Sequence, residues 1–158
     1  MNPGTELVAA SFRDPHGFVF RRGSVLYRQV NEVHRPHLDR FTESGLYDRL
    51  VADELLVAHE DVDLSLAAAP DACRIIQPEE IPFISYPYEW SFSMLRDAAL
   101  ATLRIQELAL DHGMSLRDAT AYNLTFHKGR PQFLDTTSFE ILPEGRPCVA
   151  YRQFCQHF

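Results

Sequence analysis

The segment LRDATAYNLTFHKGRPQFLDTTSFE, residues 116–140, decides how the fold is interpreted. Asp118 is followed five residues later by Asn123, and Asp135 comes twelve residues after Asn123. Between the last two, the apolar runs 124–126 and 132–134 flank a turn at Lys128-Gly129-Arg130, a pattern typical of a β-hairpin. Asp and Asn are common turn residues, but they are also side chains that hold a metal ion against phosphates. The two acids and the amide therefore stand at the ends of a predicted hairpin, either as turn residues or as ligands.

The flanking sequence predicts a mixture of strands and helices. β-Forming residues at 17–30 predict a hairpin around Arg21-Arg22-Gly23, and residues 37–56 have helical periodicity with a break at Gly45. Apolar runs around Pro78 and Pro82 predict two short strands, whereas 60–72 is interpreted as a connector. The clearest helix is 93–112, with Ser91 or Ser93 as its cap and Gly113 after its end.

The composition indicates a globular chain and argues against several classes of protein. Apolar residues make up 46% of the 158, enough for a packed core, and the net charge of −7 argues against a nucleic-acid binder. The sequence offers no membrane span and no signal-peptide pattern, so we expect a cytoplasmic protein. Three cysteines without zinc spacing fit free thiols. The aromatic C-terminus suggests that the fold continues beyond Phe158 or that this end docks onto a partner.

The order of these features resembles the catalytic centre of the protein-kinase-like superfamily, which includes small-molecule kinases. There, an Arg-Asp-x-x-x-x-Asn loop follows a long helix, and a two-strand hairpin then ends at a metal-binding Asp. Arg117-Asp118, Asn123 and Asp135 match these positions. The resemblance implies an α+β, protein-kinase-like fold, with a small lobe and hinge in residues 1–90 and a truncated large lobe in residues 91–158.

The same resemblance implies a role for each matched residue. Asp118 is expected to act as the base or to orient the acceptor, and Asn123 and Asp135 are expected to hold Mg²⁺ with ATP. The strand that carries a lysine in that superfamily offers Arg28 here, with Glu43 as its expected helix partner.

The chain departs from that superfamily at several positions. It has no Gly-x-Gly-x-x-Gly, so the turn Asp14-Pro15-His16-Gly17 is the candidate to cover the phosphates. Leu116 stands where a His precedes Arg-Asp, and Thr136-Thr137 stand where Phe-Gly follows the metal-binding Asp. We therefore expect a site that binds Mg²⁺ and a nucleotide without necessarily transferring phosphate on its own.

A second resemblance runs through nearly the whole chain. The segments SFRDPHGFVFRRG, FISYPYEWSFSMLRDAALATL, MSLRDATAYNLTFHKGRPQFLDTTSFE and VAYRQFCQHF resemble the N-terminal region of a bacterial family of class I SAM-dependent methyltransferases, some labelled nodulation-related. In that family the methyltransferase domain lies C-terminal to this region. No strand here leads into a Gly-x-Gly-type loop, so SAM is expected to bind only through a domain outside this chain.

Two functions and one structural alternative follow from these patterns. The first function is a Mg-nucleotide-binding, phosphotransferase-like module with a small-molecule substrate. The second is a non-catalytic accessory or recognition domain for a methyltransferase domain, in the same chain or a separate one. Alternatively, Asp118, Asn123 and Asp135 serve only as turn and capping residues. The aromatic run 86–92 fits a base-stacking hinge, a partner surface or ordinary core packing.

Overall fold

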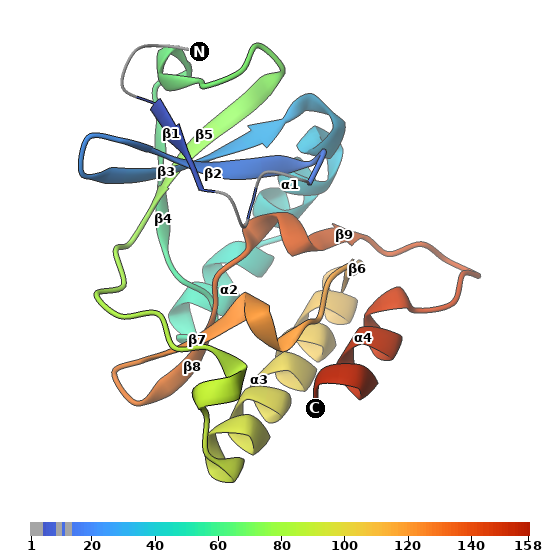
Figure 1. Ribbon diagram of the computed structural model, residues 1–158. Helices are drawn as coiled ribbons and strands as arrows, with labels where there is room; N and C mark the ends of the chain where they lie inside the picture. Colours follow the sequence, from blue (N-terminus) through green and yellow to red (C-terminus); the bar gives the residue numbers. More distant parts are fainter. Residues whose placement is uncertain (1–4, 9–10, 12–13) are drawn as a thin grey trace. The chain divides into compact units, whose positions relative to one another are not determined.

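The computed structural model describes residues 5–8, 11 and 14–158 and shows an α+β chain (Figure 1). Its residues group into two compact units, Met1–Pro36 with Ala58–Glu80 and His37–Val57 with Ile81–Phe158. The α+β class predicted from the sequence is confirmed, while the likeness to a kinase small lobe stays a prediction. Because compactness does not measure independent folding, the expected division at residue 90 also stays a prediction.

The first unit is built on an antiparallel sheet. Hydrogen bonding places its strands in the order β1-β2-β3-β5-β4. They are β1 (Thr5–Leu7), β2 (Gly17–Arg22), β3 (Val25–Asn31), β4 (His59–Val62) and β5 (Ala72–Pro78). The 3₁₀ turn η2 (Glu32–His34) follows β3. β2 and β3 pair around a turn at Gly23, which confirms the predicted hairpin.

One face of this sheet carries a small apolar core. Phe20 is fully buried there and stacks on Tyr27 with ring centroids 5.6 Å apart. The loop that contains η3 (Leu64–Leu66) packs against this cluster. The fully buried side chain of Gln29 fastens the loop, because its Oε1 accepts hydrogen bonds of 3.0 Å from the amides of Ala68 and Ala69.

Two predictions about the middle of the chain are wrong. Residues 60–72, interpreted as a connector, contain most of β4 and all of η3. β4 lies at the sheet edge and exposes Glu60 and Asp61, so it lacks the apolar alternation that marks a half-buried strand. Residues 79–86, all described, form no strand although an apolar run surrounds Pro82. Pro82 has no amide hydrogen to donate to a sheet, and Phe83 is exposed.

The second unit is mainly helical. Its helices are α1 (Arg35–Glu43, whose first two residues belong to the first unit), α2 (Leu46–Ala52), α3 (Phe92–Asp111) and α4 (Val149–His157). Its strands are β6 (Met114–Leu116), β7 (Leu124–His127), β8 (Arg130–Phe133) and β9 (Phe139–Ile141). Single 3₁₀ turns occur at η4 (Pro87–Glu89), η5 (Ala121–Asn123) and η6 (Thr136–Ser138).

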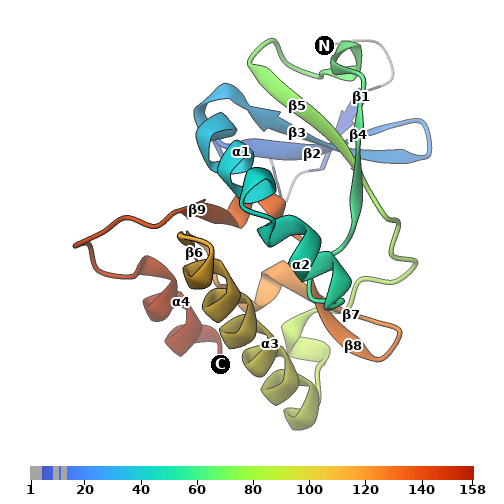
Figure 2. The same cartoon turned by 180° about the vertical axis from the view of Figure 1, so that it is seen from behind.

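Local signals set the ends of these helices. The Ser91 hydroxyl caps α3 by accepting a hydrogen bond of 3.3 Å from the Met94 amide. Gly113, at φ 71°, follows the end of α3, and Gly45, at φ 78°, separates α1 from α2 (Figure 2). Both glycines adopt the left-handed conformation that their predicted positions require.

A buried aromatic cluster connects the elements that carry the candidate site. Phe139 of β9 stacks on Phe41 of α1 at 4.5 Å and meets Phe133 of β8 edge-on at 5.8 Å. All three rings are buried almost completely. β7 and β8 pair from Leu124↔Phe133 to His127↔Arg130, which confirms the hairpin predicted from residues 124–134.

Candidate functional site

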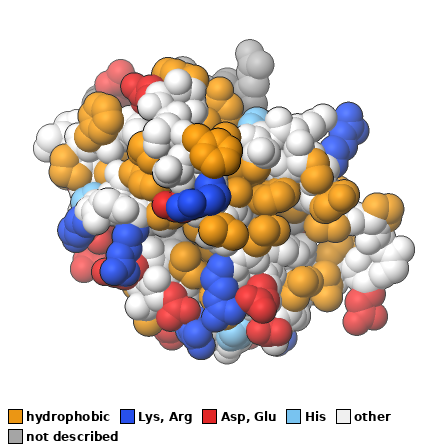
Figure 3. All heavy atoms as spheres, turned by 90° about the horizontal axis from the view of Figure 1, so that it is seen from below, with side chains coloured by type: hydrophobic (Ala, Val, Ile, Leu, Met, Phe, Trp, Pro, Cys, Tyr) orange, Lys and Arg blue, Asp and Glu red, His pale blue; other side chains and the backbone are white. Residues whose placement is uncertain are grey.

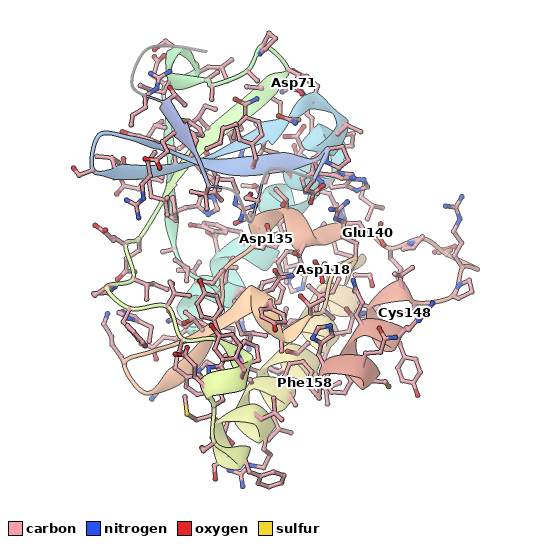
Figure 4. All side chains as sticks on the ribbon, viewed as in Figure 1. Asp71, Asp118, Asp135, Glu140, Cys148 and Phe158 are labelled. Carbon is pink, nitrogen blue, oxygen red and sulfur yellow. The ribbon has the colours of Figure 1, made fainter. Side chains whose placement is uncertain are left out.

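Two loops that carry the predicted acids are brought together by strand pairing. β6 pairs with β9 from Met114↔Ile141 to Leu116↔Phe139. The amide of Arg117 extends this ladder by donating to the Ser138 carbonyl at 2.8 Å. The loop after β6 therefore lies beside the loop before β9, and these loops carry Asp118 and Asp135 (Figure 4).

Asn123 joins the same two loops from the foot of the hairpin. Its backbone carbonyl accepts a hydrogen bond of 2.8 Å from the Leu134 amide, next to Asp135. Its side-chain nitrogen donates to the Ser138 hydroxyl at 3.2 Å, and Ser138 is buried. Because the nitrogen contacts Ser138, the atom of Asn123 that would contact a cation is Oδ1.

Both candidate carboxylates also make turn contacts. Asp135 Oδ1 accepts hydrogen bonds from the amide and hydroxyl of Thr137 at 2.8 and 2.6 Å and so caps η6. Asp118 Oδ1 accepts a hydrogen bond of 3.0 Å from the Thr120 amide. The structure thus brings together Asp118, Asn123 and Asp135, but with contacts that a purely structural role would also require.

The donor set fits magnesium better than metals that need a full protein cage. No group of three or more His, Cys, Asp or Glu side chains that could hold a metal ion occurs within residues 5–8, 11 and 14–158. Mg²⁺ is commonly held by one or two carboxylates, with phosphate oxygens and water filling its other positions. A carboxylate from Asp135 and an amide oxygen from Asn123 match that arrangement.

Arg28 and Glu43 lie in different units. Arg28 is in β3, opposite Val19 of β2 and Ile76 of β5, whereas Glu43 is the last residue of α1. Their predicted pairing, and their contact with a nucleotide, stay predictions. Within its own unit, Arg28 acts electrostatically on His59 of β4. Burial lowers the pKa of His59 to about 4, Asp61 opposes this change, and Arg74 and Arg28 add to it.

The turn at 14–17 has a structural reason for its glycine. The Asp14 side chain accepts a hydrogen bond of 2.9 Å from the His16 amide. A Cβ atom on Gly17 would stand 2.4 Å from the Gln29 carbonyl oxygen of β3. Gly17 is therefore required for the close approach of β2 and β3, whether or not the turn covers phosphates.

The sequence did not reveal the contact between α4 and the candidate loop. Gln153 Oε1 accepts a hydrogen bond of 3.0 Å from the amide of Ala119, which follows Asp118. A glutamine on a helix is so common on protein surfaces that no sequence signal marks this one. The part played by Ser138 is equally invisible, because it depends on the β6–β9 pairing.

The aromatic run before α3 divides into a packed and an exposed part. Trp90 packs edge-on against Phe126 at 5.2 Å and donates from Nε1 to the Ser85 hydroxyl at 3.0 Å. Tyr86 and Tyr88 stack on each other at 5.6 Å and are exposed. Packing therefore accounts for Trp90 but not for Phe92 at the end of the run, which is 82% exposed.

Comparison with known proteins gives one clear similarity. No family model matches the chain. No helix of the described residues is long and apolar enough to cross a membrane. The chain is 36% identical over 153 residues to a protein named Nodulation protein NoeA from Rhizobium meliloti (strain 1021), a match that covers 96% of the chain and 32% of that protein. The chain thus spans about a third of the length of a nodulation-related relative, while the likenesses to methyltransferases and kinases stay predictions.

Proposed function

We propose that the loops around β6, β7, β8 and β9 form the Mg²⁺–nucleotide site of a kinase-like, phosphotransferase-like module. The observation that carries this proposal is the hydrogen bond of 2.8 Å between the Leu134 amide and the Asn123 carbonyl. It fixes Asn123 beside Asp135 at the foot of the hairpin, while Arg117 fixes the Asp118 loop to Ser138. Backbone hydrogen bonds thereby connect Asn123 and the two loops that carry Asp118 and Asp135.

Each side chain has a chemical role in this proposal. Asp135 and Asn123 Oδ1 would hold Mg²⁺, which would supply positive charge to offset that of the phosphates. Asp118 would accept the proton of the acceptor hydroxyl as that oxygen forms its bond to the γ-phosphorus and the nucleoside diphosphate departs.

A bound metal ion would allow this acidic chain to bind a negatively charged phosphate group. The net charge of the chain is −7, and two of the candidate site residues, Asp118 and Asp135, are carboxylates. A phosphate group alone would be repelled, whereas a bound cation inverts the local charge. Nucleotide binding is therefore expected to require Mg²⁺.

The experiment is calorimetric titration of the chain with ATP, with and without Mg²⁺, for wild type and Asp135→Asn. Asn caps 3₁₀ and helical turns about as well as Asp, so η6 should persist while the negative charge is lost. The matched control is Asp63→Asn, because Asp63 caps η3 through the same kind of bond, accepted from the Ser65 amide at 2.7 Å. We expect Mg-dependent binding that Asp135→Asn abolishes and Asp63→Asn leaves intact. Equal affinities for all three proteins, or binding that ignores Mg²⁺, would refute the proposal.

The relative's greater length favours a second candidate function. The match covers only 32% of that protein, so the chain corresponds to one part of that relative. In this alternative the chain is a non-catalytic accessory or recognition domain for a SAM-dependent methyltransferase domain. A folded chain that binds no Mg-nucleotide would support the alternative over the first proposal.

A further inference from the structure

The second unit contains an apolar groove between α3 and α4. Its volume is about 550 Å³, and the segment 142–148 between β9 and α4 forms one of its sides. Representative lining residues are Leu103, Leu110, Leu116, Ala119, Val149 and Phe154. We call this feature the α3–α4 groove.

The polar groups on its floor are paired with one another. Gln106 Nε2 donates to the Ser115 hydroxyl at 3.1 Å, and Gln106 Oε1 accepts from the Leu116 amide at 2.9 Å. Ser115 is buried. Gln106 and Ser115 already satisfy each other, and Glu140 and Arg146, which also line the groove, carry opposite charges, so an apolar occupant fits better than a charged one.

Apolar side chains also continue over both rims of the groove. On α3, Leu103 and Leu110 are 50% and 45% exposed, and on α4, Val149 and Tyr151 are 62% and 70% exposed. Figure 3 shows hydrophobic side chains gathered next to one another on the face seen from below. A small molecule in the groove would leave these rims in water, whereas a second polypeptide would cover them.

The shape and charge of the rims indicate the kind of polypeptide. Leu103 and Leu110 are seven residues apart, so they lie along one face of α3 and match the repeat of a helix packed against it. Arg104 and Glu107, between them on α3, form an ion pair with each other. The rim thus presents apolar side chains and little net charge, which suits the apolar stripe of an amphipathic helix.

We propose that the α3–α4 groove is the docking site for an amphipathic helix from additional polypeptide of the kind that the nodulation relative possesses. The match leaves roughly two thirds of that relative unaccounted for, so a larger molecule contains ample chain to supply such a helix. The inference goes beyond the proposed function, and neither depends on the other. Nucleotide binding is tested with a variant of Asp135, whereas docking is tested with variants of residues at the groove.

The test compares the 158-residue chain alone with a chimera in which it replaces the matched segment of the nodulation relative. The readouts are the alkylation rate of Cys148, an exposed residue that lines the groove, and amide hydrogen exchange in α4. We expect both rates to be roughly tenfold slower in the chimera. Cys73 of the first unit is the internal reference for alkylation.

Two variants assign any protection to the groove. Leu103→Glu with Tyr151→Glu should restore fast alkylation and exchange in the chimera. Leu64→Glu, at a residue of the first unit that is also 50% exposed, should leave the protection unchanged. Circular dichroism of each variant in the isolated chain checks that it folds.

Several results would overturn the proposal. One is equal rates in the chain and the chimera, and another is protection that survives Leu103→Glu with Tyr151→Glu. Protection that appears in the isolated chain as its concentration rises would identify a second copy of the chain as the occupant. If the chimera does not fold, the chain is titrated with the unmatched segment of the relative as a separate polypeptide, and absence of protection there overturns the proposal as well.

Discussion

The partly buried His59 of β4 is expected to lower the stability of the protein in mild acid. Burial lowers the pKa of His59 to about 4, against about 6.5 for a histidine in an unfolded chain. Between these values the unfolded chain binds a proton that the folded chain does not. The contribution of the neutral His59 to the free energy of unfolding is therefore fully present above pH 6.5. It decreases as the pH falls and is lost as the pH reaches about 4.

The size of this loss follows from the two pKa values. A difference of about 2.5 corresponds to about 3 kcal/mol, because each pKa unit is worth about 1.4 kcal/mol. This is an upper limit, since the side chain is only partly buried and retains some contact with water. Burial is the largest cause of the lowered pKa, and the charges of Asp61, Arg74 and Arg28 are smaller ones. High salt should therefore reduce the effect only slightly.

The assay is urea denaturation followed by circular dichroism at intervals from pH 7 to pH 4, for wild type and His59→Gln. Glutamine keeps a polar side chain but does not titrate in this range. We expect the free energy of unfolding of the wild type to fall by about 2–3 kcal/mol more than that of the variant. Hydrogen exchange of the β4 and β5 amides should report the same difference locally. Parallel curves for the two proteins would refute the reasoning.

Two further predictions concern the first unit and use urea denaturation. Gly17→Ala should lower the free energy of unfolding by about 3 kcal/mol, because the new Cβ would stand 2.4 Å from the Gln29 carbonyl oxygen. The control Gly129→Ala, at φ 78° with open space around it, should lower it by about 1 kcal/mol. Equal costs would show that the approach of β2 and β3 is not the constraint. Gln29→Leu should cost about 1–3 kcal/mol, since it leaves two half-buried loop amides without their acceptor, whereas Gln77→Leu on exposed β5 surface should cost little. Similar values for the two glutamines would contradict the role given to Gln29.

Helices α1, α2 and α3 and the two hairpins could be predicted because their signals are local, whereas α4 was not predicted. The break at Gly45, the cap at Ser91 and the hairpin around Gly129 each depend on residues within one or two turns of chain. β4 could not be predicted in this way. It is an edge strand whose exposed acids hide its pairing, and only the register with β5, from His59↔Pro78 to Val62↔Ile75, makes it a strand.

The candidate site, too, could be predicted only in part. The types and spacing of Asp118, Asn123 and Asp135 were visible in the sequence, and so was the hairpin that brings Asn123 close to Asp135, but the position of the Asp118 loop was not. It depends on the β6–β9 pairing, whose strands are separated by 22 residues of intervening loop and hairpin. The supporting contacts of Ser138 and Gln153 depend on the same pairing and on α4. Spacing predicts which side chains can form a site, whereas tertiary pairing decides whether they meet.

Capping and metal binding place compatible demands on Asp135. A carboxylate has about four lone-pair positions, and the two hydrogen bonds from Thr137 are both accepted by Oδ1. Such bonds orient a carboxylate without removing its charge, and orientation is what a metal site needs from its supporting residues. The turn contacts therefore do not decide between the two roles. Only the charge does, and for that reason the substitution that keeps the cap and removes the charge is the informative one.

One hydrogen bond connects the α3–α4 groove with the loop that carries Asp118. Ala119 lines the α3–α4 groove, and its amide is held by Gln153 of α4 at 3.0 Å, one residue from Asp118. A helix docked in the groove would pack against α4 and restrict its motion. Through the hydrogen bond of Gln153 to Ala119, that restriction would reach the loop that carries Asp118. Additional polypeptide would then act on the loop through α4 without contributing a residue to the site.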